Sequence, residues 1–372
     1  MVYDLSGRPA LDDLVTTQAL RGEYVPTETN GHRLIVVSDI HGMDEALSAL
    51  LQSVGYSGPG GKDHIVATGD VVGKGPDSAA VVDRLMSLNA TVVRGNHEDR
   101  LLLTHREAES RRGVAADIDA QQGSLAAAAH RGQSDYVELA RTLSPDQLDW
   151  LDSLPVILTI EPLRLAVVHA GLLPGTPLEL QDPAAVMNMR TVSYPRVNLR
   201  SKAGEHPAVL PRFDSVADPE AGIATARKDS PPTATAVDAV PSDEPTLESL
   251  QEMVDGAEDE VSPTAPEDDE NYIDTSEITY DRQVAIPSDS AHGEKWAEAW
   301  TAYQKRLPRE DRLSVIYGHD SRTGYVETDY TIGIDSGCVK GGSLSALIVE
   351  ADPFGKGFKH TVLQVECTKP SP

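Results

Sequence analysis

The chain has few cysteines and no long apolar run, and each absence narrows the class of protein. Its 372 residues include only two cysteines, Cys338 and Cys367. Two are too few for a disulfide framework, and their spacing is wrong for a cysteine-ligated zinc site, so we expect a reducing compartment. No stretch of about 18 apolar residues could span a membrane. The N-terminus lacks the basic stretch and apolar core of a secretory signal, and we therefore predict a cytoplasmic protein.

Basic residues are also scarce, with 32 Lys and Arg against 59 Asp and Glu and a net charge of -27. The lack of a basic stripe argues against long nucleic acid as a partner. Much of the negative charge lies between Asp214 and Asp289, where 21 acidic residues face three basic ones. Because this stretch has few apolar residues to offset its ordering entropy, we predict a disordered acidic insertion at 213–290. The alternative is an arm that contacts another protein or covers a phosphate-binding cleft.

Outside this stretch, short continuous apolar runs alternate with segments whose apolar residues recur at helical spacing. Short β-branched runs predict strands, and apolar residues at helical spacing from 44 to 54 predict an amphipathic helix. A second helix is predicted after Asp77, and a later one contains Trp296 and Trp300. Strands that alternate with helices predict a layered α/β domain. The predicted strands are 34–37, 64–68, 91–93, 165–168, 313–317, 331–334 and 344–349.

The same patterns predict one domain that the insertion interrupts. We expect an irregular leader at 1–32, a first part of the domain at 33–212 and a second part at 291–372. The segment from 100 to about 154 has a helical pattern, and no internal repeat is visible.

Side chains that bind metals follow five of the predicted strands, each with a glycine alongside. They offer oxygen and nitrogen but no thiolate, which suits manganese, iron, cobalt or zinc. Two ions about 3.5–4 Å apart share a carboxylate, and Asp70 is placed to bridge them. The first ion would take Asp39 and His41. The second would take Asn96, His169 and His319, and a water between the ions would become hydroxide near neutral pH and attack phosphorus.

Each cluster alone has a simpler explanation. A single histidine is more often a core residue than a ligand, and Asp70 after Gly69 could be a turn or helix cap. Five such clusters at strand ends favour the metal site over turn chemistry.

Four more residues are candidates for the handling of a phosphoryl group. His97 follows Asn96 and is predicted to act as the general acid for the leaving oxygen, with a purely structural histidine as the alternative. Lys74, Arg94 and Arg190 are candidate clamps for phosphate oxygens, although any of them could be an ordinary surface charge.

Five sequence blocks together resemble the calcineurin-like metallophosphoesterases. The C-terminal block is closest to the diadenosine tetraphosphatase-like group, which is related to serine/threonine phosphoprotein phosphatases and to endopolyphosphatases. The resemblance covers residues 33–190 and about 296–350, and implies a two-sheet β-sandwich flanked by helices, with two metal ions at the strand ends. The blocks are Asp39-Ile40-His41-Gly42, Gly69-Asp70-x-x-x-Lys74-Gly75, Gly95-Asn96-His97-Glu98, His169-Ala170-Gly171 and Gly318-His319, with Gly333-Ile334-Asp335-Ser336-Gly337-Cys338 in the tail.

One departure from the family pattern concerns the substrate. Phosphoprotein phosphatases carry Asp-Arg where this chain has Gly73-Lys74, so the aspartate that is expected to orient the catalytic histidine is absent. The lysine is similar to the diadenosine tetraphosphatase-like group, some of whose relatives are vacuolar polyphosphatases. We therefore expect a phosphoanhydride hydrolase, and the resemblance favours inorganic polyphosphate as its substrate, ahead of dinucleoside polyphosphates and capped RNA in the same class. The alternatives are a serine/threonine phosphoprotein phosphatase and a non-catalytic phosphate-binding protein.

Overall fold

The computed structural model describes residues 14–114, 129–194, 285–352 and 357–370. These residues belong to one compact unit built from both sides of the segment 198–279. Most of the predicted insertion, 213–290, lies outside the described residues, as does the first part of the predicted leader.

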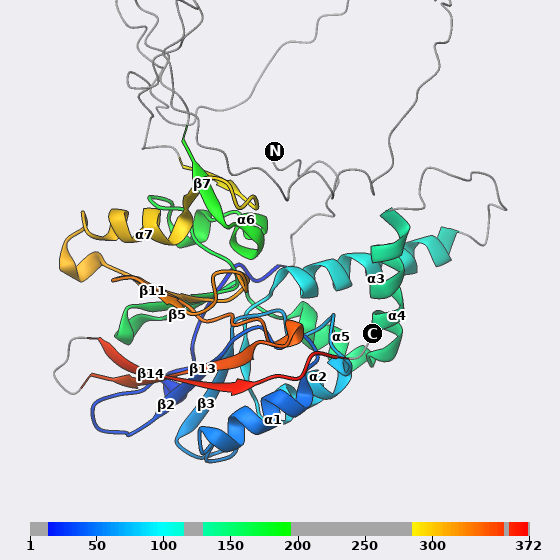
Figure 1. The fold of residues 1–372 in the computed structure, drawn as a ribbon, viewed down its shortest axis with the longest axis horizontal. Helices are drawn as coiled ribbons and strands as arrows, with labels where there is room; N and C mark the ends of the chain where they lie inside the picture. Colours follow the sequence, from blue (N-terminus) through cyan, green and yellow to red (C-terminus); the bar gives the residue numbers. More distant parts are fainter. Residues whose placement is uncertain (1–13, 115–128, 195–284, 353–356, 371–372) are drawn as a thin grey trace, which may run out of the picture. The chain divides into compact units, whose positions relative to one another are not determined.

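Two β-sheets lie face to face and form the centre of the molecule (Figure 1). One has the strand order β14-β13-β2-β3-β4 and the other β1-β5-β6-β10-β12-β11, and a small third sheet has the order β8-β7-β9. The strands are β1 (Thr17–Ala19), β2 (Arg33–Val37), β3 (Asp63–Ala67), β4 (Thr91–Val92), β5 (Ile157–Ile160), β6 (Leu165–Val168), β7 (Thr191–Ser193), β8 (Ile286–Ser288), β9 (Glu294–Lys295), β10 (Ser314–Tyr317), β11 (Val326–Glu327), β12 (Thr331–Gly333), β13 (Ser343–Ala351) and β14 (Phe358–Glu366).

Alternation along β2 shows how the layers form. Leu34 and Val36 belong to the apolar cluster between the two large sheets, and Ile35 and Val37 belong to a cluster under helices. Because successive side chains of a strand point to opposite faces, a continuous apolar run is buried on both sides. A third cluster packs the outer face of the second sheet against helices.

Helices cover both outer faces of this sandwich (Figure 1). Leu47, Val81 and Leu151 bring α1, α2 and α5 onto the sheet that contains β2, while Val186 and Trp300 bring α6 and α7 onto the other sheet. The α-helices are α1 (Asp44–Ser53), α2 (Ser78–Ser87), α3 (Asn96–Val114), α4 (Ala129–Thr142), α5 (Pro145–Asp152), α6 (Pro183–Asn188) and α7 (Trp296–Gln304). Short 3-10 helices are η2 (Gly22–Tyr24), η3 (Glu161–Leu163), η4 (Leu178–Leu180), η7 (Arg309–Asp311) and η8 (Cys338–Lys340).

The predicted fold class, a two-sheet sandwich flanked by helices, is confirmed. The predicted strands all appear, and Asp77 caps α2 by accepting a hydrogen bond from the Ala80 N–H. Other elements were not anticipated. β1 lies within the segment predicted as an irregular leader and pairs with β5, and β8 lies within the predicted insertion and pairs with β7.

The two cysteines form a disulfide between Cys338 and Cys367, which the sequence analysis did not expect. The bond joins η8 to the residue that follows β14. Sequence counting missed it because the residues are brought together by the antiparallel pairing of β13 with β14. Among the described residues, no helix is long and apolar enough to cross a membrane.

Candidate metal centre

All six predicted metal ligands gather at one edge of the sandwich, where strands from both large sheets end. Asp39 and His41 follow β2, Asp70 follows β3, and Asn96 begins the helix after β4. His169 follows β6 and His319 follows β10, which are parallel neighbours in the other sheet. Strands of both sheets therefore deliver side chains to one place.

Asp70 lies at the centre of the cluster and faces histidines from both sheets. Its Oδ2 is 3.6 Å from His41 Nε2, and its Oδ1 is 3.4 Å from His169 Nε2. Two groups of metal-binding geometry contain it, one with His41 and His97 and the other with His169 and His319. Asn96 Oδ1 lies 3.0 Å from His169 Nε2 and completes the second group.

Each of the three predicted histidine ligands is oriented by a backbone carbonyl behind it. His41 Nδ1 donates to Val72 O at 3.1 Å, and His169 Nδ1 donates to Thr68 O at 2.9 Å. His319 uses the other nitrogen, with Nε2 donating to Asn188 O at 3.2 Å. A metal-binding histidine needs its second nitrogen held in this way, since the hydrogen bond fixes both the tautomer and the ring plane. The remaining nitrogens face the centre of the cluster.

The electrostatics of the cluster fit divalent cations. Burial and the nearby charges of Asp335 and Asp70 raise the pKa of Asp39 well above its usual range, and burial raises the pKa of Asp70 to about 7. Carboxylates crowded in a buried place need positive charge for compensation. Burial also lowers the pKa of His41 to about 3 and of His169 to about 4, which keeps both imidazoles neutral, the form that binds metal.

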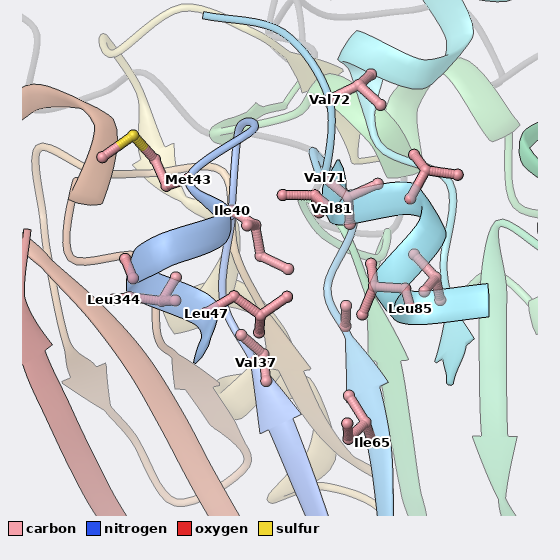
Figure 2. Close-up of a cluster of buried hydrophobic side chains, with 14 of the residues drawn as sticks. Val37, Ile40, Met43, Leu47, Ile65, Val71, Val72, Val81, Leu85 and Leu344 are labelled. Atoms are coloured by element: carbon pink, nitrogen blue, oxygen red, sulfur yellow. The ribbon is translucent and has the colours of Figure 1, made fainter. Parts of the chain in front are cut away.

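Left-handed backbone occurs at three of the predicted ligands and at Lys74. His41, Asp70, Lys74 and His319 have φ of 48°, 49°, 62° and 68°, in the left-handed region that residues with a side chain rarely adopt. Such strain persists only where the surroundings hold it in place. Figure 2 shows part of what holds it: Ile40 and Val71, each next to a ligand, point into the apolar cluster beneath the site.

Glycines next to the ligands leave room for carboxylates. A Cβ at Gly95 would collide with Asp70 Oδ1, and a Cβ at Gly318 would collide with Asp39 Oδ1. The glycine beside the clusters of Asn96 and His319 is thus a steric requirement of the site.

Glu98 organises the loop that carries Asp70, although the sequence analysis gave it no role. Its buried carboxylate accepts hydrogen bonds from the backbone N–H groups of Asp70, Val71, Val72 and Gly95, at 2.8, 2.9, 3.1 and 2.8 Å. One side chain therefore fixes the loops after β3 and β4 relative to each other.

His97 lies beside the ligands, on the first turn of α3. Its ring lines the cavity over the cluster, and its Nε2 is 3.9 Å from Asp70 Oδ2. Burial, with His41 and Lys74 nearby, lowers the pKa of His97 to about 2, so the ring is neutral. Its Nδ1 lies 2.6 Å from the hydroxyl of Tyr136, a contact that no sequence motif indicated.

A cavity of about 280 Å³ opens over the cluster. Lys74 and Arg190 line it, as expected of phosphate clamps. Arg94 does not: it is buried, and its guanidinium donates to the backbone O of Asp152 and, at 3.0 Å, to Asp152 Oδ1. The structure gives Arg94 the role of tying β4 to the end of α5, so we remove it from the proposed clamp.

Other residues that were not predicted as site residues also line the cavity, among them the charged residues Asp335, Arg100, Lys340 and Asp289. Asp335 follows β12, so the strand-end rule that found the other carboxylates could have found it. Arg100 lies three residues after His97 on α3, and a helical spacing places both on one face. Lys340, on η8, lies two residues after Cys338, the last residue of the tail block.

Comparison with known proteins places this site in a family. The model of the calcineurin-like phosphoesterases matches residues 32–230. The chain belongs to this family. The symmetrical bis(5'-nucleosyl)-tetraphosphatase of Acidovorax sp. (strain JS42) is 28% identical over 332 residues, which cover 84% of this chain and 91% of that protein. The enzyme of the same name from Hamiltonella defensa is 32% identical over 142 residues, 37% of this chain and 44% of its own.

A solved structure agrees with the family fold. The crystal structure of a "putative diadenosine tetraphosphatase" has a TM-score of 0.53 and 23% identity, and the match covers 95% of this chain and 99% of that one. The resemblance stated from the sequence blocks is confirmed. As a member of this family with tetraphosphatase relatives, the chain is a metal-dependent phosphatase, and its gathered aspartates and histidines could hold the metal.

Proposed function

We propose that this protein hydrolyses phosphoanhydride bonds, with dinucleoside polyphosphates as its substrates. The observation that carries the proposal is the number of cations around one small cavity: Lys74, Arg100, Arg190 and Lys340 all line it. A phosphomonoester needs a clamp for one phosphoryl group only. A chain of phosphates presents charge on both sides of the bond that breaks, and cations on several walls suit it. The tetraphosphatase relatives support the same substrate class.

Two divalent ions fit the donor set. Asp39, His41 and Asp70 would hold the first, and Asp70, Asn96, His169 and His319 the second. When bound, such ions supply a water of lowered pKa and a Lewis acid for phosphoryl oxygens. The metal is manganese, zinc, iron or cobalt by ligand type.

The chain's own residues position the substrate. Lys74 and Arg190 bind the oxygens of the phosphoryl group that is transferred to water. Arg190 is held at the site by a 3.4 Å hydrogen bond from its guanidinium to His319 O. Arg100 and Lys340 are exposed at the rim and would bind the phosphates on either side. His97 faces the leaving oxygen.

Inorganic polyphosphate offers the same phosphate chemistry and is the second substrate to test. Phosphopeptides and capped RNA are the remaining substrates to compare.

The domain boundaries and the acidic insertion at 213–290 remain proposals. A cytoplasmic location also remains a prediction, and the disulfide does not favour it, because disulfides are more typical of oxidising compartments.

The test compares substrates on charge variants. Arg100→Gln and Lys340→Gln should each raise KM for diadenosine tetraphosphate by about fivefold to tenfold, since each removes a charge-assisted hydrogen bond. Neither should change KM for p-nitrophenyl phosphate, which has no second phosphate. Lys359→Gln is the matched control, because this lysine pairs with Glu350 on the sheet away from the cavity. Equal effects on both substrates, or wild-type activity that is higher on phosphopeptides, would contradict the proposal.

A further inference from the structure

The residue that orients His97 comes from an unexpected part of the chain. Tyr136 lies on α4, is 8% exposed, and places its hydroxyl 2.6 Å from His97 Nδ1. Its ring lies beside the guanidinium of Arg100, whose carbon is 5.7 Å from the ring centroid. The phenol is therefore held on one side of His97 by packing as well as by the hydrogen bond.

Gly73 explains why that nitrogen is available. Its φ is +82°, and a Cβ there would lie 2.8 Å from His97 Nδ1. A side chain at position 73 would thus be aimed at the atom that Tyr136 contacts. With glycine at this position, the phenol is the group that meets Nδ1.

The direction of the hydrogen bond follows from the partners of the phenol. Burial raises the pKa of Tyr136 to about 12, so the hydroxyl keeps its proton. Arg100, the side chain that shares a hydrogen bond with this hydroxyl, has only donors to offer. Among the described residues, His97 Nδ1 is the partner that can accept the phenol proton.

We propose that Tyr136 is a positioning residue that donates its O–H to His97 Nδ1 and thereby fixes the tautomer with hydrogen on Nε2, facing the cavity. This inference rests on the proposed phosphoanhydride chemistry for its consequence, but not for its geometry. As the bond from phosphorus to the leaving oxygen breaks, the oxygen takes the bonding electron pair and accepts a hydrogen bond from Nε2–H. The proton stays on Nε2, and the leaving group departs as an anion.

This arrangement selects among leaving groups. A phosphate leaving group is stable as an anion and needs only the hydrogen bond. A serine alkoxide needs a full proton, and an imidazole whose Nδ1 accepts the phenol O–H offers a hydrogen bond from Nε2–H rather than a proton. Tyr136 and Gly73 together therefore favour phosphoanhydrides over phosphoserine.

The first test is spectroscopic and needs no substrate. In protein labelled with ¹⁵N-histidine and loaded with zinc, a diamagnetic ion, we expect His97 to show a protonated Nε2 and an unprotonated Nδ1. In Tyr136→Phe the His97 signals should move toward a mixture of tautomers. Tyr330→Phe is the matched control, since it removes a phenol that accepts a hydrogen bond from Arg312 away from the cavity.

The second test is kinetic. Tyr136→Phe should lower kcat on diadenosine tetraphosphate by about tenfold or more, the loss typical of a misplaced donor, while KM changes by less than about twofold. Tyr330→Phe should change neither value.

A protonated Nδ1 in the wild-type protein would overturn the proposal, as would unchanged His97 signals and kcat in Tyr136→Phe. The wild-type spectrum decides even if the variant does not fold. Failure of the proposed substrate would appear differently: tetraphosphate would not be cleaved, while the tautomer and its dependence on Tyr136 would remain.

Discussion

At the scale of single residues, the site depends on side chains that never touch a phosphate. Glu98 shows this most clearly, because its carboxylate accepts four backbone hydrogen bonds from the loops around Asp70. Glutamine has the same shape but one acceptor oxygen in place of two. We expect Glu98→Gln to lower the free energy of unfolding by about 1–3 kcal/mol, since buried N–H groups lose their partner.

The same change should weaken metal binding, because the loop that carries Asp70 is less well held. Thermal unfolding and metal content after dialysis measure the two effects. Glu45→Gln, an exposed residue of α1, is the control. Unchanged stability and metal content in Glu98→Gln would show that the loop keeps its conformation without the Glu98 carboxylate.

The gathering of the six predicted ligands at one place could be predicted from the sequence, because each lies shortly after the end of a buried strand. The roles of Arg94 and Tyr136 could not. Arg94 precedes the signature Gly95-Asn96 but turns away to Asp152, a partner 58 residues later. Tyr136 is 39 residues from His97 and lies in a helical stretch without a motif. In both cases the partner is set by packing between segments that lie far apart in the sequence.

At the scale of elements, buried strands were easy to predict and exposed ones were not. β2 is apolar on both faces from Leu34 to Val37, so its sequence is a continuous apolar run, and β3 is buried along its whole length. β14 is as long as β13 but only partly buried along its length, with polar residues such as Lys359 and Gln364. Its structure comes from its pairing with β13, which local sequence does not reveal.

The disulfide at the end of β14 gives a prediction for these elements. Cys367→Ser opens a covalent loop of 29 residues and should destabilise the protein by about 3 kcal/mol, with a lower Tm. Reductant should lower the Tm of the wild type in the same way. It should leave the Tm of Cys367→Ser unchanged, which serves as the control. A wild-type Tm that does not respond to reductant would mean that the bond contributes nothing to stability.

At the scale of the whole molecule, the site is assembled from both sides of the segment 198–279. The two parts are joined by the parallel pairing of β6 with β10, and by the pairing of β2 with β13. A protease site placed between residues 230 and 231 tests whether this strand pairing alone holds the two parts together and keeps the site active. After cleavage we expect the two fragments to elute together in size-exclusion chromatography and to keep the kcat of the intact protein.

The same digestion of protein without the inserted site is the control. Fragments that separate without denaturant, with loss of activity, would show that the connection itself holds the halves together.

The fold class could be predicted because strand and helix patterns are strong on both sides of the segment. The resemblance of the sequence blocks to the family added the two-sheet sandwich and the place of the metal site at the strand ends.

The distance along the chain between His169 and His319, which touch in the structure, has a consequence for synthesis on the ribosome. They are separated by 150 residues. At a synthesis rate of about 5–20 residues per second, the last ligand emerges roughly 8–30 seconds after the others. During that interval β6 lacks the neighbour that later covers its edge, and an uncovered edge can pair with another chain. Nascent chains that stop before β10 should therefore be the most aggregation-prone form of this protein.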